Sequence, residues 1–511
     1  MKGKICVSIY GTNAAETLDR IERARAGADL IEVRFDALDD TEIDRLLDEL
    51  PIESDKYLFT FRPKERGGLR PISIGQRLKF WERVIHKFNG CDFFADLEPD
   101  ILSSVDLQAD RTIVSHHDFE RTPADLDVTV TALSDLSNGI LKIAVTANDI
   151  CDSIQLWKLF VSAAAADGKF VPIAMGEAGK WTRILSLAHG APMTFAAPDA
   201  DGKTAPGQIS VEEMLDLYRV GELNRETRVY GVVAGDTSYS MSPYLHNTAF
   251  AAANLNSVFV PLQVKDLGQF IRRMVRRETR EIDLNFCGFA VTNPHKVAII
   301  PHLDKTDAAA RAIGAVNTVS IGDDGRLLGF NTDAAGFIAP LEKKFTALAG
   351  ARVAVAGAGG AARGCVYALR NAGVEAVTVF ARSVERARDL ADEFGVTIEE
   401  LRIAGDERGA TDLSGYDIVV NTTPLGTRGE NEERSIARAE QLRGVSLVYD
   451  LNYNPVETRL LSEAKAAGCA TLGGLDMLAA QAAMQFTIWT GLDQAPTAAM
   501  RAAAEKKLAT R

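Results

Sequence analysis

Short apolar segments alternate with amphipathic or alanine-rich segments over the first part of the chain. Eight apolar runs of strand length recur, at 4–9, 29–35, 56–61, 91–97, 111–116, 140–145, 170–175 and 193–197. Helical patterns lie between most of them, for example at 14–27 and 150–168. Eight strands that alternate with helices predict a (β/α)8 barrel. An open doubly wound sheet is the alternative, and the number of strands favours closure.

The rest of the chain also alternates strands and helices, with two breaks in the pattern. A polar segment at 223–228 predicts a short connector, and further on a charged helix gives way to a strand and a glycine-rich turn. We therefore predict an α/β protein with a barrel at 1–222, a second domain at 226–340 and a third at 350–475. The alanine-rich tail at 476–511 predicts helices that pack back on the second domain.

Composition and charge narrow the classes of function. The chain has 57 Lys and Arg against 70 Asp and Glu, a net charge of −13, which suits small-molecule substrates better than nucleic acid. No apolar run approaches the about 18–20 residues of a membrane span, and the first residues read as a strand rather than a leader. The six cysteines show no C-x-x-C spacing. We expect a cytoplasmic protein with reduced thiols and without a metal site; the sequence does not indicate its oligomeric state.

Polar residues gather at the ends of the predicted barrel strands. In a (β/α)8 barrel, catalytic residues lie where the strands end, at one face. The strand-end residues here are Glu32 and Arg34, Thr60 and Arg62, Asp96 and Glu98, and Ser115 to Asp118. Any one of these could be a surface charge, but together they would point into a single mouth.

Lys142 is the most informative single residue, because it lies inside a six-residue apolar run. A lysine inside a packed barrel loses hydration, which favours the uncharged amine. Free amines attack ketones to give Schiff bases, which act as electron sinks. Two other interpretations stay open: a lysine that reaches solvent from an edge strand, or a structural ion pair with Glu32 or Glu98.

A histidine pair follows the preceding strand. His117 would lie near Lys142 at the mouth and could act as general base and acid. A structural histidine is the alternative, and the neighbouring His116 leaves open which of the two faces the site.

Several of these segments occur in a characteristic order: E-V-R-F-D, F-T-F-R-P, S-H-H-D-F, L-K-I-A-V and T-A-P-G-Q-I-S. Together they resemble type I 3-dehydroquinate dehydratase, a (β/α)8 enzyme of the shikimate pathway, over 1–215. The resemblance implies that Lys142 is the Schiff-base lysine and His117 the general base. It assigns the substrate's carboxylate and hydroxyls to Glu32, Arg34, Arg62, Arg183, Thr204 and Gln208. Asp96 and Glu98 are implied as structural supports.

Two positions depart from the pattern of that family. Arg66 stands where a Glu is usual before the paired glycines of the loop after the third strand, and Glu65 lies one residue earlier. Thr204 replaces a common Ser and keeps the hydroxyl. The first departure concerns the loop that closes over the site, and both departures leave the lysine and the histidine in place.

A glycine-rich turn follows the strand at 352–356. Gly357, Gly359, Gly360 and Ala361 would let a pyrophosphate approach the N–H groups at a helix N-terminus. The next strand ends in Arg382 and Ser383, with Arg386 close behind, where an NAD site would carry Asp or Glu. The arginines favour NADP, whose 2′-phosphate they would bind. The alternative is an arginine paired with Glu385 at a helix start.

Polar turns precede this segment. Ser240 and Ser242 flank Met241 before a predicted helix, which simple helix capping would also explain. Lys296 and Asp333 stand in separate polar turns, which suits a polyhydroxylated ligand, although a surface ion pair is equally consistent.

These segments resemble shikimate dehydrogenase over 229–495. The matching motifs are S-x-S-P, V-T-x-P-x-K, A-V-N-T, G-x-N-T-D, G-A-G-G-A-x-R, N-T-T-P-L-G, Y-x-P-x-x-T-x-L-L and G-x-x-M-L-x-x-Q-A. The resemblance implies Lys296 and Asp333 as the catalytic pair. It implies that substrate is held by Ser240, Ser242, Thr292, Asn317, Tyr453 and Gln481. It places Asn421, Thr422 and Gly474 near the nicotinamide. Tyr239 departs from the family's usual His.

The order of the two halves resembles the bifunctional dehydratase–dehydrogenase of plants. The resemblance implies dehydration of 3-dehydroquinate to 3-dehydroshikimate, followed by reduction to shikimate with NADPH. Which of Lys296 and Asp333 gives the proton stays open. Two rival hypotheses are an NAD-dependent enzyme pair that acts on quinate, and a regulatory homologue without catalysis.

Overall fold

The computed structural model describes residues 3–51, 56–166, 169–199, 201–202, 204–345, 348–403 and 409–510. The chain forms two compact units. The first unit consists of Met1–Ser240 and Asn256–Phe286. The second unit consists of Met241–Leu255 and Cys287–Arg511. Each unit is described by itself.

Eight parallel strands form the centre of the first unit. They are β1 (Lys4–Ile9), β2 (Leu30–Arg34), β3 (Tyr57–Thr60), β4 (Phe94–Leu97), β5 (Thr112–Asp118), β6 (Ile140–Thr146), β7 (Phe170–Met175) and β8 (Met193–Ala196). Their order is β7-β6-β5-β4-β3-β2-β1-β8, so β1 to β7 lie side by side in sequence order and β8 lies beside β1. Because β1 pairs with β8, the sheet curls into a nearly closed barrel. The predicted (β/α)8 barrel is confirmed, and the doubly wound alternative is wrong, since the strand order contains no reversal.

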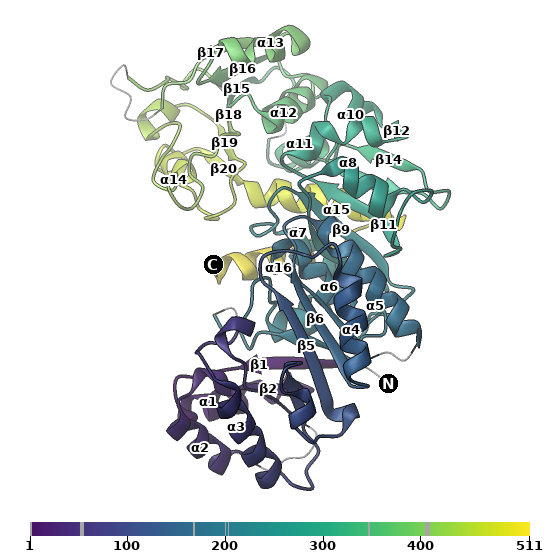
Figure 1. Cartoon of the computed structure of the whole chain (residues 1–511). Helices are drawn as coiled ribbons and strands as arrows, with labels where there is room; N and C mark the ends of the chain where they lie inside the picture. The colour runs from purple at the N-terminus through teal and green to yellow at the C-terminus, as the bar shows by residue number, and fades with distance from the viewer. Residues whose placement is uncertain are drawn as a thin grey trace. The chain divides into compact units, whose positions relative to one another are not determined.

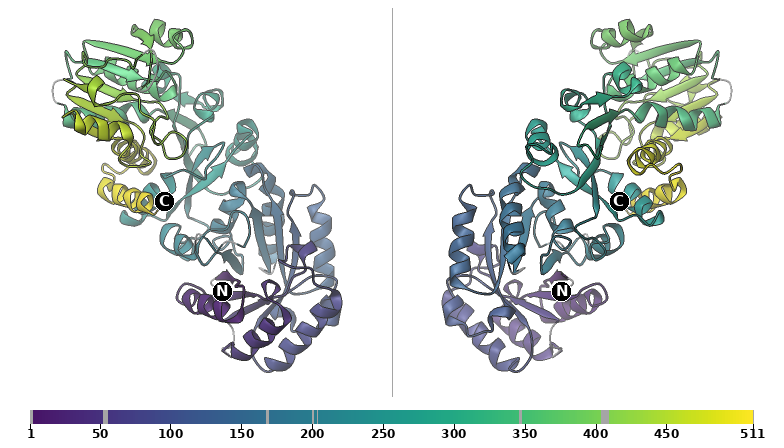
Figure 2. Two further views of the ribbon diagram at one scale, coloured as in Figure 1. Left: turned by 90° about the vertical axis from the view of Figure 1, so that its left-hand side faces the viewer. Right: turned by 90° about the vertical axis from the view of Figure 1, so that its right-hand side faces the viewer.

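Helices surround the strands on the outside (Figure 2). They are α1 (Ala14–Ala24), α2 (Asp40–Glu49), α3 (Ile74–Lys87), α4 (Leu126–Leu136), α5 (Ile154–Ala166) and α6 (Lys180–Leu185). The start of α3 shows why the sequence forms these helices where it does. Ser73 and Gln76 make a reciprocal capping box, and Phe80, Trp81 and Val84 then bury one face.

The barrel interior is layered, because every second residue of a strand points inward. The lowest layer is apolar and includes Cys6, Leu30, Leu58, Phe94, Ile113, Ile140, Val171 and Met193. Two residues further along the same strands stand Ser8, Glu32, Thr60, Asp96, Ser115, Lys142, Ile173 and Phe195. Six of these eight residues are polar or charged, and those six are all buried. The barrel interior thus changes from an apolar layer to a polar layer over two residues along each strand.

The first unit continues beyond the barrel. A parallel pair of strands, β9 (Arg228–Ala234) and β10 (Ser257–Gln263), is followed by α8 (Leu267–Phe270). The barrel contacts this segment directly: Asp149, in the loop after β6, accepts backbone hydrogen bonds from Lys265 at 2.6 Å and Asp266 at 3.3 Å. α6 also packs against β10. The barrel and this strand pair are therefore one packed body.

The second unit contains a six-stranded parallel sheet. Its strands are β15 (Arg352–Ala356), β16 (Ala376–Ala381), β17 (Thr397–Glu400), β18 (Ile418–Asn421), β19 (Leu447–Asp450) and β20 (Ala470–Gly473). Their order is β17-β16-β15-β18-β19-β20, and every pair is parallel. This is the strand order of a dinucleotide-binding fold, which reverses between β15 and β18. The predicted Rossmann arrangement is confirmed.

Both faces of this sheet are apolar, because helices cover both faces and successive residues of a strand point to opposite faces. Val353 and Val355 of β15 face one core, together with α12 (Gly360–Asn371) and α13 (Arg388–Phe394). Ala354 and Ala356 face the other core, which α14 (Arg459–Ala466) covers. Figure 1 shows α12 and α14 on opposite sides of the strands.

The second unit also holds a smaller group of strands and helices. β11 (Phe286–Val291) pairs with β13 (Thr318–Ile321), β13 with β14 (Leu327–Phe330), and β14 with β12 (Lys305–Thr306). The helices are α7 (Ser242–Ala252), α9 (His295–Ala298), α10 (Ala308–Ile313), α11 (Asp333–Lys344), α15 (Gly474–Thr490) and α16 (Thr497–Ala509). α7 packs against both α15 and α16. Within the described ranges, no helix combines the length and apolar character that a membrane span needs.

Candidate active sites

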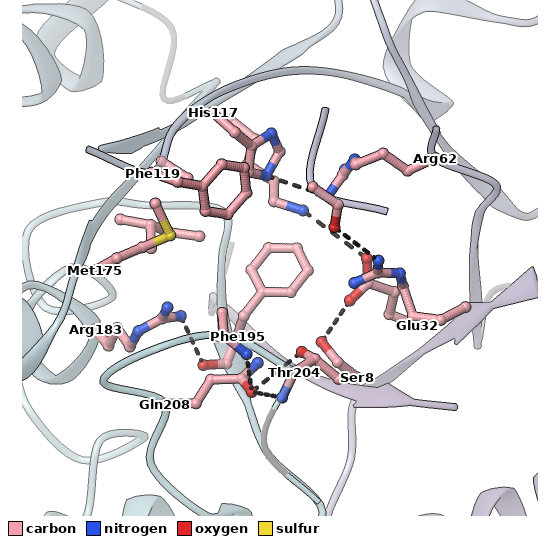
Figure 3. Close-up of a pocket in the computed structure, with 16 residues that line it drawn as sticks. Ser8, Glu32, Arg62, His117, Phe119, Met175, Arg183, Phe195, Thr204 and Gln208 are labelled. Atoms are coloured by element: carbon pink, nitrogen blue, oxygen red, sulfur yellow. Dashed lines mark hydrogen bonds and ion pairs between the residues drawn. The ribbon is translucent and has the colours of Figure 1, made fainter. Parts of the chain in front are cut away.

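The barrel mouth contains a cavity lined mainly by polar residues. Its lining includes every residue that the sequence assigned to the first site: Glu32, Arg34, Arg62, His117, Lys142, Arg183, Thr204 and Gln208. Figure 3 shows Arg62 and Arg183 on opposite sides of the cavity, with Phe195 between them. The strand-end residues therefore converge, as the barrel rule predicts.

Lys142 lies in the polar layer of the barrel and is only 4% exposed. Its Nζ donates to Asp96 Oδ2 at 2.7 Å and lies 3.9 Å from Glu32 Oε1. The Nζ also stands 4.2 Å above the ring of Phe195. β6 lies between β5 and β7, so the edge-strand interpretation of Lys142 is wrong. An ion pair with Glu98 is also wrong, because Asp96 occupies that place.

Asp96 and Arg62 form the charged base of the site. Arg62 Nη2 donates to Asp96 at 2.7 Å, and its Nε donates to Glu98 at 3.1 Å. Burial alone would raise the pKa of Asp96, but the charges of Arg62 and Lys142 outweigh it and hold that pKa well below its usual range. Asp96 is thus a permanent anion that positions Lys142, a closer role than the support that the sequence implied.

His117 points into the same cavity from the end of β5. Its Nε2 lies 3.2 Å from Arg62 Nη1. Since a guanidinium can only donate, this Nε2 must be the unprotonated acceptor of a neutral imidazole. Burial, followed by the charges of Arg62 and Lys142, lowers the pKa of His117 well below 6.5. His116 is one residue earlier and therefore on the other face of the strand, which resolves the choice that the sequence left open.

The two remaining arginines differ in their partners. Arg34 is bidentate on the buried carboxylate of Asp36, with distances of 2.8 and 2.7 Å. Arg183 has no ion-pair partner among the described residues, and its Nη1 donates only to the Phe195 carbonyl at 3.3 Å. Burial lowers the pKa of Arg183 to about 10, so it remains a cation at neutral pH. A buried cation without a counterion suits a negatively charged ligand.

Loops close the mouth from two sides. Gln208 Oε1 accepts hydrogen bonds from the backbone N–H and the hydroxyl of Thr204, at 2.7 and 3.1 Å. Gly67 lines the cavity with φ +88°, and a Cβ there would collide with the ring of Phe119. Arg66, the departure noted in this loop, is exposed.

Sequence reasoning missed several lining side chains, among them Ser8, Phe119, Met175 and Phe195. Ser8 hydrogen bonds to Glu32. It could have been found from the sequence, because it is a polar residue inside the apolar run at 4–9. Phe119 stacks on His117 with ring centroids 5.8 Å apart. The apolar residues carry no signal, because Met and Phe in a strand predict only core packing.

A second polar cluster lies in the second unit, around Lys296 and Asp333. Lys296 Nζ donates to Asp333 Oδ2 at 2.6 Å. Asn317 Nδ2 donates to Asp333 Oδ1 at 2.7 Å and to Thr332 Oγ1 at 2.9 Å. Gln481, on α15, reaches the same cluster, with Oε1 3.5 Å from Asn317 Nδ2. The structure therefore brings together Lys296, Asp333, Asn317 and Gln481, and the ion pair is part of a network rather than an isolated surface pair.

The other predicted substrate residues come from separate segments of the chain. Ser242 is the first residue of α7, and Thr292 follows β11, where its carbonyl accepts the N–H of His295 at 2.8 Å. Tyr453 is half-buried in the turn after β19. Ser240 is the last residue of the first segment of the first unit.

The glycine-rich turn lies at the carboxyl end of β15, where the strand order reverses. Gly357 has φ +108°, and a Cβ there would lie 2.3 Å from Thr422 Oγ1. Gly359 caps α12, and a Cβ on Gly359 or Gly360 would meet nothing within 4 Å. Ala361 is exposed in the first turn of α12. The helix N-terminus is thus open to a ligand, which fits a pyrophosphate.

The other residues predicted to bind the dinucleotide differ in how far they are exposed. Arg382 and Ser383 are exposed directly after β16, while the side chain of Arg386 lies outside the described residues. Asn421 is fully buried, and its amide spans Leu425 O and Asp450 at 3.1 and 3.0 Å. Thr422 Oγ1 donates to Ala356 O at 2.7 Å. Gly474 begins α15, where a Cβ would collide with Leu451 O.

Comparison with sequence families divides the chain into known parts. Residues 5–225 match the model of type I 3-dehydroquinase. Residues 232–319 match the shikimate dehydrogenase substrate binding domain, and 340–453 match shikimate / quinate 5-dehydrogenase. Residues 474–505 match the shikimate 5′-dehydrogenase C-terminal domain.

Individual proteins give the same picture. The bifunctional 3-dehydroquinate dehydratase/shikimate dehydrogenase of Arabidopsis thaliana, described as chloroplastic, is 33% identical over 94% of this chain and 81% of its own length. The NADP(+) shikimate dehydrogenase of Carboxydothermus hydrogenoformans is 38% identical over 53% of this chain and 94% of its own. A crystal structure of shikimate dehydrogenase with NADP+ has 36% identity and a TM-score of 0.50, covering 56% of this chain and 97% of that chain.

Proposed function

Because the chain belongs to the family of bifunctional 3-dehydroquinate dehydratase/shikimate dehydrogenases, we propose that its two sites catalyse consecutive steps. The barrel dehydrates 3-dehydroquinate to 3-dehydroshikimate, and the second site reduces that product to shikimate with NADPH. The observation that carries the proposal is the shared cavity of Lys142, His117 and Arg183. It combines an amine, a neutral base and an anion-binding cation, which dehydration of a keto acid requires.

In the barrel, the amine of Lys142 adds to the substrate ketone, and loss of water gives an iminium ion. The iminium draws electrons from the adjacent carbon, so that His117 can remove a proton there. The same histidine then returns the proton to the departing hydroxyl, which leaves as water. Hydrolysis of the product iminium restores Lys142. Asp96, 2.7 Å from Nζ, holds the lysine in place and offsets the positive charge of the iminium.

Substrate orientation follows from the partners of the charged residues. Arg183 has no carboxylate partner in the described protein, so the substrate carboxylate is its natural counterion. Arg34 and Arg62 are already paired with carboxylates, and with Glu32 they bind the hydroxyl groups instead. Thr204 and Gln208 cover the mouth beside Arg183 (Figure 3).

The state of His117 gives a pH dependence. Burial and neighbouring cations lower its pKa well below 6.5. Because the reaction needs the neutral imidazole, kcat/KM for dehydration should fall only as the pH drops well below 6.5. We would measure kcat/KM between about pH 4 and pH 8, with His116→Gln as the control that keeps the profile. An acidic limb centred at or above 6.5 would show that His117 is not the base.

The second unit fits NADP on two observations. The open N-terminus of α12 receives the pyrophosphate, since Gly359 and Gly360 leave the space free. Arg382 and Ser383, at the end of β16, provide a cation and a hydroxyl for the 2′-phosphate. When bound, NADPH supplies the reducing equivalent for the ketone.

The protein groups at this site manage the proton and the substrate hydroxyls. Lys296 donates the proton to the oxygen that becomes an alcohol. Asp333 accepts hydrogen bonds from both Lys296 and Asn317, so it holds the Lys296 Nζ in place. Ser240, Ser242, Thr292, Asn317, Tyr453 and Gln481 bind the substrate, and Asn421, Thr422 and Gly474 shape the turn beside the nicotinamide.

Replacement of Arg382 tests the cofactor choice. Arg382→Ala should raise KM for NADPH about tenfold or more, because a charged hydrogen bond to phosphate is lost, and should leave KM for NADH unchanged. The matched control is Arg370→Ala, which removes an exposed arginine near the far end of α12. Equal effects on both nucleotides would refute the 2′-phosphate role.

Product analysis tests the proposed function as a whole. With 3-dehydroquinate alone, the chain should form 3-dehydroshikimate, and added NADPH should convert it to shikimate. Turnover of quinate with NAD in preference to these substrates would favour the quinate hypothesis instead. Binding of the ligands without turnover would favour a regulatory homologue.

We place these reactions in the cytoplasm. All six cysteines are free thiols, which fits a reducing compartment. The partners required are small molecules only: the two substrates, shikimate and NADP.

A further inference from the structure

A buried histidine lies one helical turn below a proposed substrate residue. Ser242 begins α7, and His246 follows four residues later on the same helix face. His246 is 0% exposed, and burial lowers its pKa to about 3, so it stays neutral. Its ring lies 5.0 Å from that of Trp489. Neither the sequence motifs nor the proposed mechanism uses this residue.

The partner of His246 repeats the same spacing on another helix. Nε2 of His246 lies 3.1 Å from Oε1 of Gln485, on α15. Gln481, which is proposed to bind substrate, lies four residues before Gln485 and so one turn away on the same face. The bond between His246 and Gln485 therefore ties the two helices together one turn below each proposed substrate residue.

Donors and acceptors fix the direction of this contact. Gln485 Nε2 donates to Thr318 Oγ1 at 2.9 Å and to Asn317 O at 3.2 Å. Its Oε1 must then be the acceptor from His246, which places the proton of the neutral imidazole on Nε2. A glutamine with both ends engaged in a buried site has one orientation.

The hydrogen bonds continue in one direction to the catalytic pair. Thr318 Oγ1 donates to Asn317 Oδ1 at 2.9 Å. Asn317 Nδ2 donates to Asp333 Oδ1 at 2.7 Å, and Lys296 donates to the other oxygen of Asp333. Every donor in the series points toward the Asp333 carboxylate. A series with a single polarity stabilises the negative charge at its end.

We propose that His246 is a positioning residue of the dehydrogenase site, which acts through Gln485 on Ser242, Gln481 and Asn317. The inference rests on the proposed function of that site and extends it to a residue that does not touch substrate. His246 fixes the orientation of Gln485, and through the hydrogen bonds of Gln485 it fixes the placement of the residues that hold the substrate hydroxyls. Removal of its donor leaves Gln485 Oε1 buried without a partner and releases Asn317 from one of its supports.

Two substitutions at His246 separate the donor from the bulk of the ring. His246→Phe keeps a flat ring against Trp489 but cannot donate, and should raise KM for 3-dehydroshikimate about tenfold. KM for NADPH and the dehydratase rate on the same chain should not change, and kcat should change less, because Lys296 and Asp333 keep their direct contact. His246→Gln places an amide donor near the position of Nε2 and should recover most of the lost affinity.

A matched control tests whether the effect is only one of helix packing. Phe250 is also buried on α7, with its ring 5.9 Å from that of Phe486 on α15. Phe250→Leu loosens the same pair of helices without a change in hydrogen bonds. It should lower the melting temperature and leave KM for 3-dehydroshikimate as in the unaltered chain.

The outcomes separate this inference from the proposed function. A raised KM in His246→Phe, recovered in His246→Gln and absent in Phe250→Leu, supports the positioning role. An unchanged KM in His246→Phe, or an equal rise in Phe250→Leu, overturns it while the proposed function stands. An unaltered chain that fails to reduce 3-dehydroshikimate overturns both. If His246→Phe does not fold, Thr318→Val replaces it in the test, because this substitution breaks the same series two hydrogen bonds further on. A raised KM for 3-dehydroshikimate then supports the positioning role, and an unchanged KM overturns it.

Discussion

Lys142→Ala should abolish dehydration of 3-dehydroquinate, with a loss in kcat of at least about 10⁴-fold, because Lys142 is the only lysine among the described residues that line the cavity. Reduction of 3-dehydroshikimate by the same variant should be unchanged, since Lys142 belongs to the first unit and Lys296 to the second. Separate assays of the two half-reactions measure both effects on one preparation.

Chemical trapping makes this prediction specific to the residue. Borohydride added with 3-dehydroquinate should reduce the iminium to a stable adduct, which peptide mapping should place on Lys142. The matched control is Lys169→Ala, which removes a lysine just before β7 whose Nζ donates to Asn138 O at 2.9 Å. It should keep both the activity and the adduct. An adduct on another lysine, or none at all, would rule out the imine mechanism.

Lys296→Met should have the opposite pattern of effects. Loss of the proton donor should lower kcat for reduction of 3-dehydroshikimate by about 10²–10⁴-fold, while dehydration continues at the rate of the unaltered chain. The bulk of the side chain is kept, so the change is mainly one of charge and proton transfer. NADPH oxidation with 3-dehydroshikimate as substrate is the measurement.

The control for Lys296 comes from the same group of strands. Lys305, on β12, is an exposed lysine outside the Asp333 cluster, and Lys305→Met should keep full activity. If Lys296→Met stopped dehydration as well, in a chain with normal thermal unfolding, the two sites would not be independent. If it left reduction intact, the proton would come from another group.

The barrel and its site could be predicted from the sequence because the pattern is local. Apolar runs of four to seven residues mark the strands, and the period of two fixes which side chains point inward. Lys142 could be found for this reason, because it lies on the same strand face as Ile140, which belongs to the lowest, apolar layer of the barrel interior. The dinucleotide turn could be found because Gly357 is required by both its φ and its closeness to Thr422.

Other features depend on contacts between distant segments, which no local pattern encodes. Asp96 contacts Lys142 across 46 positions in sequence, and only the curled sheet brings β4 and β6 to a common interior. The sequence therefore assigned Asp96 a supporting role. Phe195 is similar, since an aromatic residue in a strand predicts core packing whether or not a lysine lies above its ring.

The packing of α7 shows the same limit at a larger scale. The sequence places 241–255 in a domain with its neighbours, whereas the contacts group it with Cys287–Arg511. The domain boundaries that the sequence predicts therefore stay a prediction. His246 carried no signal of its own, because its partner Gln485 lies 239 positions away.

The central claim is that one chain performs two consecutive reactions. The most direct measurement is a single assay that contains the purified chain, 3-dehydroquinate and NADPH, followed at the nicotinamide absorbance. The account predicts that NADPH is consumed, and that both Lys142→Ala and Lys296→Met stop its consumption while an equal mixture of the two variants restores it. No loss of NADPH with the unaltered chain, or no recovery in the mixture, would contradict the account.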